Sequence, residues 1–290
     1  MTDDISGENT NQNTYIVDAE SPTEMARLIN LDRVLTQSMG GPLVGVPDLS
    51  RLRNILDLGC GPGGWVLDVA FELPDADIEG VDISRIMVDY ANARARTQQL
   101  PNASFGVMDI TLPLDFPDSA FDLVNARFLT GVLPRVHWPG FIAECTRVLR
   151  PGGIIRLTEL IDSGVSTSPA FEQLQSLIYQ ALWRTGYGFS VDGRTLGMTH
   201  AIPRLLRAAG YQDLHHQGHA LEFSVNTAGW MDFYRNAEIG YRLGKPFYLK
   251  TGVTTDEEFE QLYQQMLIEM LSDEFFGMWH YMTFFATKPV

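Results

Sequence analysis

The sequence predicts an α/β protein built on a mostly parallel sheet with helices on both faces. From residue 53 onward, short apolar segments alternate with amphipathic segments at the spacing of strand–helix units. The first apolar segment runs into a glycine-rich stretch, NILDLGCGPGGW at 54–65, which is typical of a loop that brings its backbone close to a ligand. Later strands end in acidic residues, and ligands bind at that edge of such sheets.

Five strands and two of the helices between them follow from this alternation. The predicted strands cover 54–58, 78–82, 103–109, 121–125 and 153–159. The predicted helices cover 84–98, with Ile86, Met87 and Tyr90 facing inward, and 139–149. Cys145 lies on the apolar face of the second helix, so we expect it in the core.

The segments on either side of this core have different patterns. Residues 1–14 are polar and lack periodicity, which predicts a disordered tail. Ser21 and Glu24 have the spacing of a capping box, with Pro22 at the first helical position, and Thr255 with Glu258 repeats the pattern. After residue 160 we expect a helix from 168, helices over 202–209, 228–243 and 255–271, a strand around 213–225 and a β-prone end.

We expect one globular domain made of four parts. These are the disordered tail 1–14, an N-terminal helical cap over 15–45, the core over 46–160, and 161–290, which completes the sheet and carries an inserted helical lid. Aromatic and methionine residues are enriched over 228–286, which predicts an apolar substrate pocket. The cap and the lid would both lie over the carboxyl edge of the sheet.

Composition excludes several classes of protein. The two cysteines cannot supply a disulfide framework or ligate an iron–sulfur cluster, and the formal net charge of −15 argues against a nucleic-acid partner. The sequence has neither an apolar run of membrane-spanning length nor a signal peptide, so we expect a cytoplasmic protein with no membrane partner. The sequence leaves open whether the protein forms a homodimer.

The glycine-rich stretch fits two cofactors. Gly59, Gly61 and Gly64 satisfy the G-x-G-x-x-G pattern of dinucleotide-binding loops. Asp57, together with Gly59, Gly61 and Gly63, equally resembles the S-adenosylmethionine (SAM) loop of class I methyltransferases. The glycines do not separate the two, but a carboxylate at Asp57 would repel a pyrophosphate and would favour the ammonium and sulfonium groups of SAM.

Two further acidic strand ends support a nucleoside. Asp82 ends the second strand, where a carboxylate accepts hydrogen bonds from both ribose hydroxyls, which NAD and SAM share. Asp109 ends the third strand and suits an amino donor such as adenine N6, with Met108 and Ile83 flanking the base. Asp109 therefore favours SAM more than Asp82 does.

Over residues 50–160 the chain resembles class I SAM-dependent methyltransferases, in particular the branch with UbiE-like and LaeA-like proteins. The motifs ILDLGCGPGG, GVDIS, VMDI, FDLVNARF and LRPGGIIRLTE stand in that family's order and spacing. The resemblance implies a Rossmann-like, seven-stranded sheet whose last strand is antiparallel. It also implies that these residues bind the cofactor: Asp57, Gly59, Cys60, Gly61, Gly63, Asp82, Ile83, Met108, Asp109, Ile110, Asn125, Ala126 and Arg127.

Methyl transfer is an in-line displacement that sometimes needs a group to remove a proton. The candidates for that group are His200 before the 202–209 helix, His137 at the start of a helix, and Glu159 at a strand end. The alternatives are a helix cap for His200, a helix start or packing for His137, and a solvated strand end for Glu159. Arg127 either holds a carboxylate of a ligand or pairs with an acid such as Glu159.

The other histidines and the aromatic residues carry weaker expectations. His215 and His219 share one face of a strand with Asp213 but lie too far apart for one metal ion, so we expect no metal site. Tyr15, Trp65, Phe128 and Trp138 stand near loop or helix starts, where each either packs or contacts the sulfonium through its aromatic face.

These observations predict a SAM-dependent methyltransferase. The expected acceptor is a small, fairly apolar molecule in secondary metabolism, methylated at oxygen, carbon or nitrogen. One alternative is a non-catalytic SAM-binding regulator of the LaeA-like kind. The other is an NAD-dependent oxidoreductase, which the overlapping glycines allow and which Asp57 and Asp109 disfavour.

Overall fold

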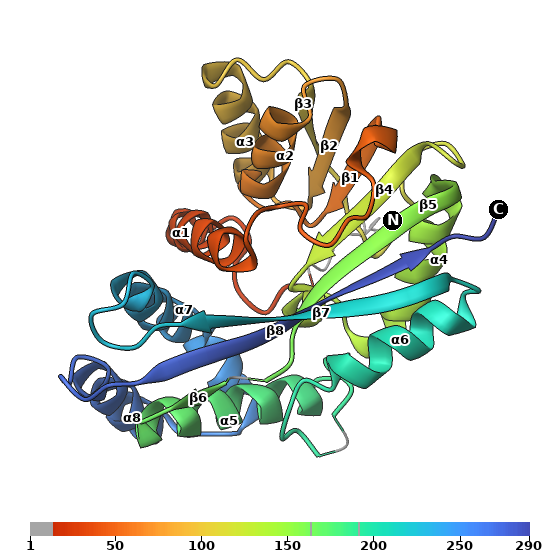
Figure 1. Ribbon diagram of the computed structural model, residues 1–290. Helices are drawn as coiled ribbons and strands as arrows, with labels where there is room; N and C mark the ends of the chain where they lie inside the picture. Colours follow the sequence, from red (N-terminus) through yellow and green to blue (C-terminus); the bar gives the residue numbers. More distant parts are fainter. Residues whose placement is uncertain (1–13, 163, 191) are drawn as a thin grey trace, which may run out of the picture.

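The computed structural model describes residues 14–162, 164–190 and 192–290, so the predicted disordered tail, apart from Thr14, lies outside the described residues. Across that range the chain forms one eight-stranded sheet with helices packed on it (Figure 1). The strands are β1 (Asn54–Leu58), β2 (Asp77–Asp82), β3 (Ala103–Val107), β4 (Phe121–Arg127), β5 (Leu149–Leu160), β6 (Val165–Ser166), β7 (Gln212–Glu222) and β8 (Gly277–Thr287).

The α-helices alternate with the strands in the first half of the chain and dominate the second half. They are α1 (Pro22–Met39), α2 (Gly64–Glu72), α3 (Arg85–Thr97), α4 (Trp138–Val148), α5 (Pro169–Arg184), α6 (Met198–Ala208), α7 (Trp230–Thr251) and α8 (Asp256–Glu269). Short 3-10 turns cover Leu49–Arg51, Leu129–Gly131 and Arg135–His137.

The strand order is β3-β2-β1-β4-β5-β8-β6, with β7 also paired to β8. Strands β1 to β5 pair in parallel, whereas β8 runs antiparallel to β5, β6 and β7, which confirms the predicted direction of the last strand. The eighth strand is β6, whose two residues pair with Met278 and Gly277. A bridge this short has no alternating pattern that a sequence could reveal.

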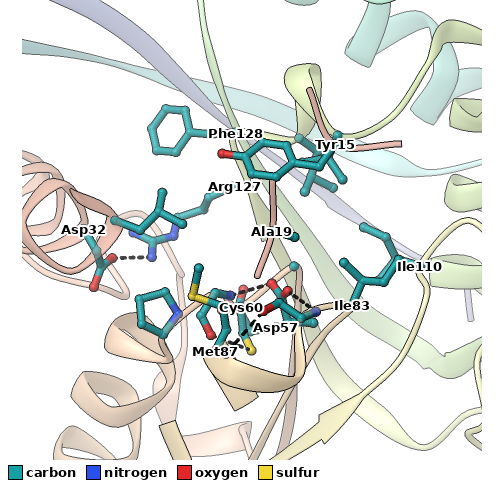
Figure 2. A pocket seen from close by; sticks show the side chains of 18 of the residues that line it. Tyr15, Ala19, Asp32, Asp57, Cys60, Ile83, Met87, Ile110, Arg127 and Phe128 are labelled. Atoms are coloured by element: carbon teal, nitrogen blue, oxygen red, sulfur yellow. Dashed lines mark hydrogen bonds and ion pairs between the residues drawn. The ribbon is translucent and has the colours of Figure 1, made fainter. Parts of the chain in front are cut away.

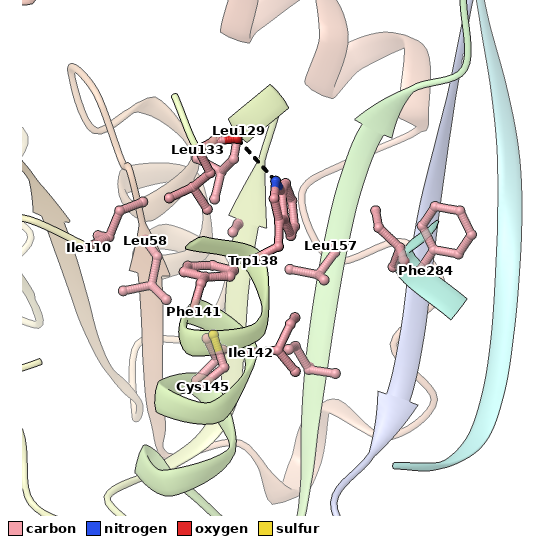
Figure 3. Close-up of a cluster of buried hydrophobic side chains, with 14 of the residues drawn as sticks. Leu58, Ile110, Leu129, Leu133, Trp138, Phe141, Ile142, Cys145, Leu157 and Phe284 are labelled. Carbon is pink, nitrogen blue, oxygen red and sulfur yellow. Dashed lines mark hydrogen bonds between the residues drawn. The ribbon is translucent and has the colours of Figure 1, made fainter. Parts of the chain in front are cut away.

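Both faces of the sheet are covered, as predicted. On one face α4 turns Trp138, Phe141, Ile142 and Cys145 toward the sheet, and all four are buried (Figure 3). The Trp138 indole also donates to the Leu133 carbonyl at 3.2 Å. On the opposite face, Trp65, Val66 and Val69 of α2 pack against Ile55 of β1 and Leu123 of β4. Cys145 is therefore a core residue, as expected.

A second apolar cluster joins α1, α5, α7 and α8 to the ends of β7 and β8. Figure 1 shows these helices gathered around one end of the long β7–β8 pair. Phe171 of α5, Phe233 of α7 and Phe223 just past β7 stack or tilt against one another at the centre of this cluster, with ring centroids 3.8–6.2 Å apart. The N-terminal helix and the late helices are therefore one packed body at one end of the sheet.

The two predicted capping boxes differ in outcome. In α8, Thr255 accepts from the Glu258 amide and Glu258 accepts from the Thr255 amide, so the box is complete. In α1, Ser21 accepts from the Glu24 amide, but the Glu24 carboxylate accepts from Tyr15 and Arg27 instead of returning to the cap. An ion pair with Arg27 of the same helix and a hydrogen bond from Tyr15 have replaced the second half of the capping box.

Candidate active site

A cavity of about 290 Å³ opens at the carboxyl ends of β1, β2 and β4, next to α1. Figure 2 shows Asp32 and Arg127 on one side of this cavity and Ile83 with Ile110 on the other, while Tyr15 and Phe128 lie opposite Asp57 and Cys60. We call it the cofactor cavity. Its position is the one that a parallel sheet assigns to a ligand.

The loop after β1 turns its backbone toward this cavity. Gly59, Gly61 and Gly63 have φ of 72°, 52° and 78°, which is the left-handed region that favours glycine. A Cβ atom at Gly63 would lie 2.6 Å from the Phe105 ring, and one at Gly64 would lie 1.8 Å from Oδ2 of Asp32. Glycine is therefore required both by backbone conformation and by the approach of other groups.

Asp57 ends a chain of buried polar groups behind the cavity. The Asn125 amide donates to Oδ1 of Asp57 at 2.7 Å, and Nη1 of Arg156 donates to the Asn125 carbonyl oxygen at 2.6 Å. Burial raises the pKa of Asp57 to about 6, although the nearby Arg127 guanidinium acts in the opposite direction. The same burial lowers the pKa of Arg156 to about 9. The Arg156 contact fixes which way the Asn125 amide points.

Asp82 and Asp109 also face the cofactor cavity. Asp82 accepts from the Gly61 amide at 2.8 Å and from the Ser84 amide at 2.9 Å, so its carboxylate connects the glycine loop to the start of α3. Burial raises the pKa of Asp82. Oδ1 of Asp109 accepts from the amide and the hydroxyl of Thr111. Both side chains are therefore oriented before any ligand arrives.

Arg127 pairs with an acid that the sequence did not indicate. Its Nη2 lies 2.5 Å from Oδ1 of Asp32 on α1, and its Nη1 donates to Thr36 on the same helix. Of the two predicted alternatives, pairing with an acid is what the structure shows, but the partner is Asp32 and not Glu159. This ion pair ties α1 to β4 at the rim of the cofactor cavity.

Most of the predicted cofactor-binding residues meet at this cavity. Those that line it are Asp57, Gly59, Cys60, Gly61, Asp82, Ile83, Met108, Asp109, Ile110 and Arg127. Gly63, Asn125 and Ala126 lie behind it, where Gly63 starts α2, Asn125 supports Asp57 and Ala126 is buried in the sheet. Burial raises the pKa of the Cys60 thiol, so that residue presents a neutral wall.

A second cavity of about 220 Å³ adjoins the first. We call it the acceptor cavity. The two share five lining residues, Tyr15, Arg27, Phe128, Leu160 and Trp279. Apart from these, its wall is mainly aromatic and aliphatic and comes from α5 and α7. The shared residues make the two cavities neighbours across a thin partition.

Glu159 lines the acceptor cavity and is not a solvated strand end, because only 2% of it is exposed. Its carboxylate accepts from the Leu129 amide and from the Thr130 hydroxyl, each at 2.6 Å. Burial raises its pKa to about 7, and these two hydrogen bonds act in the opposite direction. Glu159 can therefore exchange a proton near neutral pH.

The structure does not bring the candidate histidines to either cavity. His200 is an exposed residue in the first turn of α6, which is capped by Gly197, so neither Thr199 nor His200 is the cap. His137 ends a 3-10 turn and lines neither cavity. Of the three candidates for the proton acceptor, only Glu159 lines a cavity.

The remaining aromatic residues and histidines fall into two groups, those that line a cavity and those that pack in the core or on the sheet. Tyr15 and Phe128 line both cavities, whereas Trp65 and Trp138 are buried in the core. His215 and His219 stack on Phe285 and Tyr281, so they share a face of β7 as predicted. The register shifts between Gln212 and His215, so Asp213 does not follow the alternation. Within the described residues, no group of acidic, histidine and cysteine side chains could hold a metal ion.

Sequence reasoning missed the polar cluster that α1 contributes. Glu24 is fully buried and accepts from the Tyr15 hydroxyl at 2.6 Å and from Arg27, whose Nη1 also donates to Asn236 of α7 at 2.7 Å. It also missed Arg156, although a charged residue inside the apolar run IIRLTE was a visible signal. No local pattern announces Asp32, because its role depends on where α1 packs.

A parallel sheet with a glycine cradle after β1, a carboxylate at the end of β1 and acidic side chains after β2 and β3 is the arrangement typical of class I SAM-dependent methyltransferases. Residues 55–153 match the family described as "Methyltransferase domain". Residues 55–153 therefore form a methyltransferase domain, and SAM is its cofactor.

Relatives and solved structures agree with this class. A "Probable methyltransferase ltbC" of Aspergillus luteorubrus is 27% identical over 75% of this chain and 79% of its own length. The "Secondary metabolism regulator LAE1" of Cochliobolus heterostrophus is 28% identical over 69% of this chain and 62% of its own length. The fold is similar to phosphoethanolamine N-methyltransferase 2 of Haemonchus contortus, with a TM-score of 0.56 and 18% identity over 95% of this chain and 60% of that one. Across the described residues, no helix is long and apolar enough to cross a membrane.

Proposed function

We propose that the protein transfers the methyl group of SAM to a small, fairly apolar acceptor, at oxygen, carbon or nitrogen, in secondary metabolism. The observation that carries this proposal is the pair of adjoining cavities, one lined by the acidic and glycine residues and the other by aromatic side chains. A methyl donor and its acceptor must meet end to end for an in-line displacement. Two cavities that share one partition provide that arrangement.

The residues of the cofactor cavity fit SAM by their chemistry. Asp57 supplies a buried negative charge for the ammonium group, and the amides of the glycine loop suit the methionine carboxylate. Asp82 would accept from the ribose hydroxyls and Asp109 from adenine N6, with Ile83, Met108 and Ile110 around the base. A buried carboxylate in the cradle argues against the pyrophosphate of NAD.

When bound, SAM supplies an electrophilic methyl group on a sulfonium. The chain's own residues then have three tasks, which are to hold the cofactor, to hold the acceptor behind the methyl carbon and to exclude water. Tyr15, Phe128 and Leu160 form an apolar partition at the meeting point of the cavities. Aromatic faces there also suit a nearby positive charge.

For an acceptor with an acidic proton, we propose Glu159 as the group that receives it. The oxygen of the acceptor forms a bond to the methyl carbon, the carbon–sulfur bond breaks, and the proton of the acceptor passes to the Glu159 carboxylate. A pKa of about 7 matches this task at neutral pH. We therefore expect kcat/KM to rise as pH increases through about 7, and Glu159→Gln to abolish that rise. A rise that persists in the variant would remove Glu159 from this role.

The direct test is a turnover assay with radiolabelled SAM and a panel of phenols, enols, amines and activated carbons. We expect label in at least one apolar acceptor, and Asp82→Ala to weaken the binding of S-adenosylhomocysteine (SAH) by about 1–3 kcal/mol. Its melting temperature is measured alongside, because Asp82 also holds the Gly61 and Ser84 amides. SAH binding without turnover, together with a co-purifying protein, would support the regulator. Binding of NADH without SAH would support the oxidoreductase.

The proposed acceptor is a small molecule and not a nucleic acid. The acceptor cavity is small, at about 220 Å³, and is lined largely by apolar and aromatic side chains of α5 and α7, and the formal net charge of −15 repels phosphates. The relatives named as small-molecule methyltransferases are consistent with this choice. An excess of RNA should therefore leave turnover of a small acceptor unchanged.

A further inference from the structure

Helix α5 turns one face toward the acceptor cavity. The residues of α5 that line it recur at the spacing of one helical face, and they are Phe171, Gln175, Ile178, Tyr179 and Leu182. Gln175 is the one amide on this aromatic and aliphatic face, and only 8% of it is exposed. Its amide forms no hydrogen bond with any described residue, yet neither of its polar atoms is sealed off, so a ligand in the cavity can contact them.

Helix α7 adds a second polar group of the same kind. Tyr248 lines the acceptor cavity and is 4% exposed. Its hydroxyl also has no hydrogen-bond partner in the described part of the chain, and it also keeps accessible surface. Burial raises the pKa of Tyr248, so the hydroxyl stays neutral at neutral pH.

The helix itself makes room for the Tyr248 hydroxyl. A Cβ atom at Gly244, one turn earlier in α7, would lie 2.2 Å from the hydroxyl oxygen. Glycine in a helix interior is destabilising relative to alanine. The sequence therefore has a weak helix former at a position where glycine leaves the space that the hydroxyl occupies.

Gln175 and Tyr248 lie on the same part of the cavity wall, because both act on the hydroxyl of Tyr241. Burial raises the pKa of Tyr241, Tyr248 adds to that rise, and Gln175 opposes it. The Tyr241 hydroxyl itself is fully enclosed, so it is no contact for a ligand. The two groups that a ligand can reach are therefore the Gln175 amide and the Tyr248 hydroxyl. We call them the amide–hydroxyl pair.

The amide–hydroxyl pair lies away from the partition between the cavities. Neither Gln175 nor Tyr248 is among the five residues that the two cavities share. A ligand has to present its methyl-accepting atom to the cofactor at that partition. It therefore meets the amide–hydroxyl pair with a different part of its body.

The charges of the acceptor cavity argue against an anion at this position. Arg27 is the only basic side chain that lines the cavity within the described ranges, and Glu24 and Asn236 already engage its guanidinium. Glu24 and Glu159 line the same cavity and would repel a carboxylate or a phosphate. An amide and a phenolic hydroxyl are neutral donors and acceptors, so they suit an uncharged oxygen.

We infer that the methyl acceptor carries, besides the atom that is methylated, a second polar group that is uncharged, a carbonyl or a hydroxyl, and that Gln175 and Tyr248 bind this group. The inference rests on the proposed function, because it narrows the substrate class of the same site. Gln175 and Tyr248 are thus specificity-determining residues that hold the acceptor by the end remote from the cofactor.

Three para-substituted phenols of matched shape test this inference on the full chain saturated with SAH. The second group is a neutral ketone in 4-hydroxyacetophenone, an apolar branch in 4-isopropylphenol and a carboxylate in 4-hydroxybenzoate. Titrations followed by NMR of the ligand give the three Kd values. We expect 4-hydroxyacetophenone to bind more tightly than the other two. Equal or tighter binding of either analogue would overturn the inference.

Two variants remove the polar atoms and keep the size of the side chains. Tyr248→Phe lacks the hydroxyl, and Gln175→Met lacks the amide. Each should raise the Kd of 4-hydroxyacetophenone by roughly 3- to 10-fold, which is the loss of one neutral hydrogen bond, and leave the Kd of 4-isopropylphenol unchanged. A variant that weakens both probes equally, or neither of them, removes its residue from this role.

Tyr263→Phe is the matched control for Tyr248→Phe. Tyr263 is 3% exposed, packs in the same apolar cluster and lines neither cavity, and its hydroxyl donates to the Glu238 carbonyl at 2.9 Å. It should lower the melting temperature and leave both Kd values unchanged. Tyr248→Phe should melt no lower than the parent, because its hydroxyl has no partner to lose in the free protein. A drop as large as that of Tyr263→Phe would show a structural role and contradict the inference.

A calorimetric titration with SAH keeps the two proposals apart. If SAH does not bind to the unmodified protein, the proposed function fails before any acceptor is tested. If SAH binds and the probes show no preference for the neutral ketone, this inference fails while the methyltransferase assignment stands.

Discussion

We expect the affinity for the cofactor to depend on pH mainly through the ionisation of Asp57. Burial holds its pKa near 6 in the free protein, and the ionised form is the one that attracts an ammonium group. A cationic ligand therefore has to displace one proton when the pH lies below that value. We expect the Kd of SAH to be flat above about pH 7 and to weaken by as much as tenfold per pH unit below about 6.

Asp57→Asn checks this expectation by calorimetry between pH 5 and 7. The variant keeps an acceptor for the Asn125 amide but cannot ionise. It should bind SAH more weakly at pH 7 by about 1–3 kcal/mol, and its affinity should no longer depend on pH over this range. The same pH dependence in the variant and the parent would show that another group carries the proton.

Arg156 affects the site through Asn125 and not by contact with a ligand. Its positive charge favours the ionised form of Asp57, and its Nε and Nη2 form no hydrogen bond with any residue in the described part of the chain. Arg156→Met removes a buried charge of this kind, so the free energy of unfolding should change little or increase. The pH midpoint of SAH binding should move upward, because the pKa of Asp57 rises. An unchanged midpoint would show that Arg156 serves packing alone.

At the scale of elements, strand β5 serves both cavities. Arg156 and Glu159 are three positions apart, so their side chains project from opposite faces of the strand. Arg156 reaches the polar chain behind Asp57, whereas Glu159 reaches the acceptor cavity. One strand therefore carries both Arg156, which acts on the charge of Asp57, and Glu159, the proposed proton acceptor.

Helix α1 is the element that should respond most to the cofactor. Arg27, Leu28, Leu31, Asp32 and Leu35 all line the cofactor cavity, and Asp32 ties the helix to Arg127 of β4. A ligand that contacts only the folded arrangement lowers the rate of local opening. Hydrogen exchange followed by mass spectrometry should show slower exchange in α1 when SAH is added. Helix α8, which lines neither cavity, is the internal control and should not change.

An equal response in α1 and α8 would contradict this expectation and indicate a global change in stability. Asp32→Asn sharpens the test, because it removes the charge that pairs with Arg127. In that variant α1 should exchange faster without SAH, and part of the protection on adding SAH should be lost.

At the scale of the whole molecule, local patterns were sufficient for the core of the fold. Strand β1 falls at the predicted residues, and the acids Asp57, Asp82 and Asp109 meet because the carboxyl ends of parallel strands share one edge. What could not be predicted depends on packing between distant segments. Asp32, the Glu24–Arg27 pair and Trp279 reach the cavities from α1 and β8, and no periodicity reports which helix covers which cavity. The bulge at Asp213 likewise breaks an alternation that the sequence suggests.

The global stability should fall as pH rises through the neutral range, because two buried carboxyl groups ionise unfavourably. The pKa of Glu159 is raised from 4.5 to about 7, and that of Asp57 from 3.8 to about 6. A group with a raised pKa in the folded state contributes its stability at low pH and loses it as pH passes the folded value. Urea titrations should therefore give Glu159→Gln a free energy of unfolding up to about 3 kcal/mol above that of the parent at pH 8, and nearly the same value at pH 5.

Glu144→Gln is the control of opposite sign. Pairing with Arg147 lowers the pKa of Glu144, so this variant should be less stable than the parent at pH 8. If Glu159→Gln were no more stable than the parent at pH 8, the buried carboxylate would carry no penalty, and a proton acceptor with a pKa near 7 could not be assigned to this position.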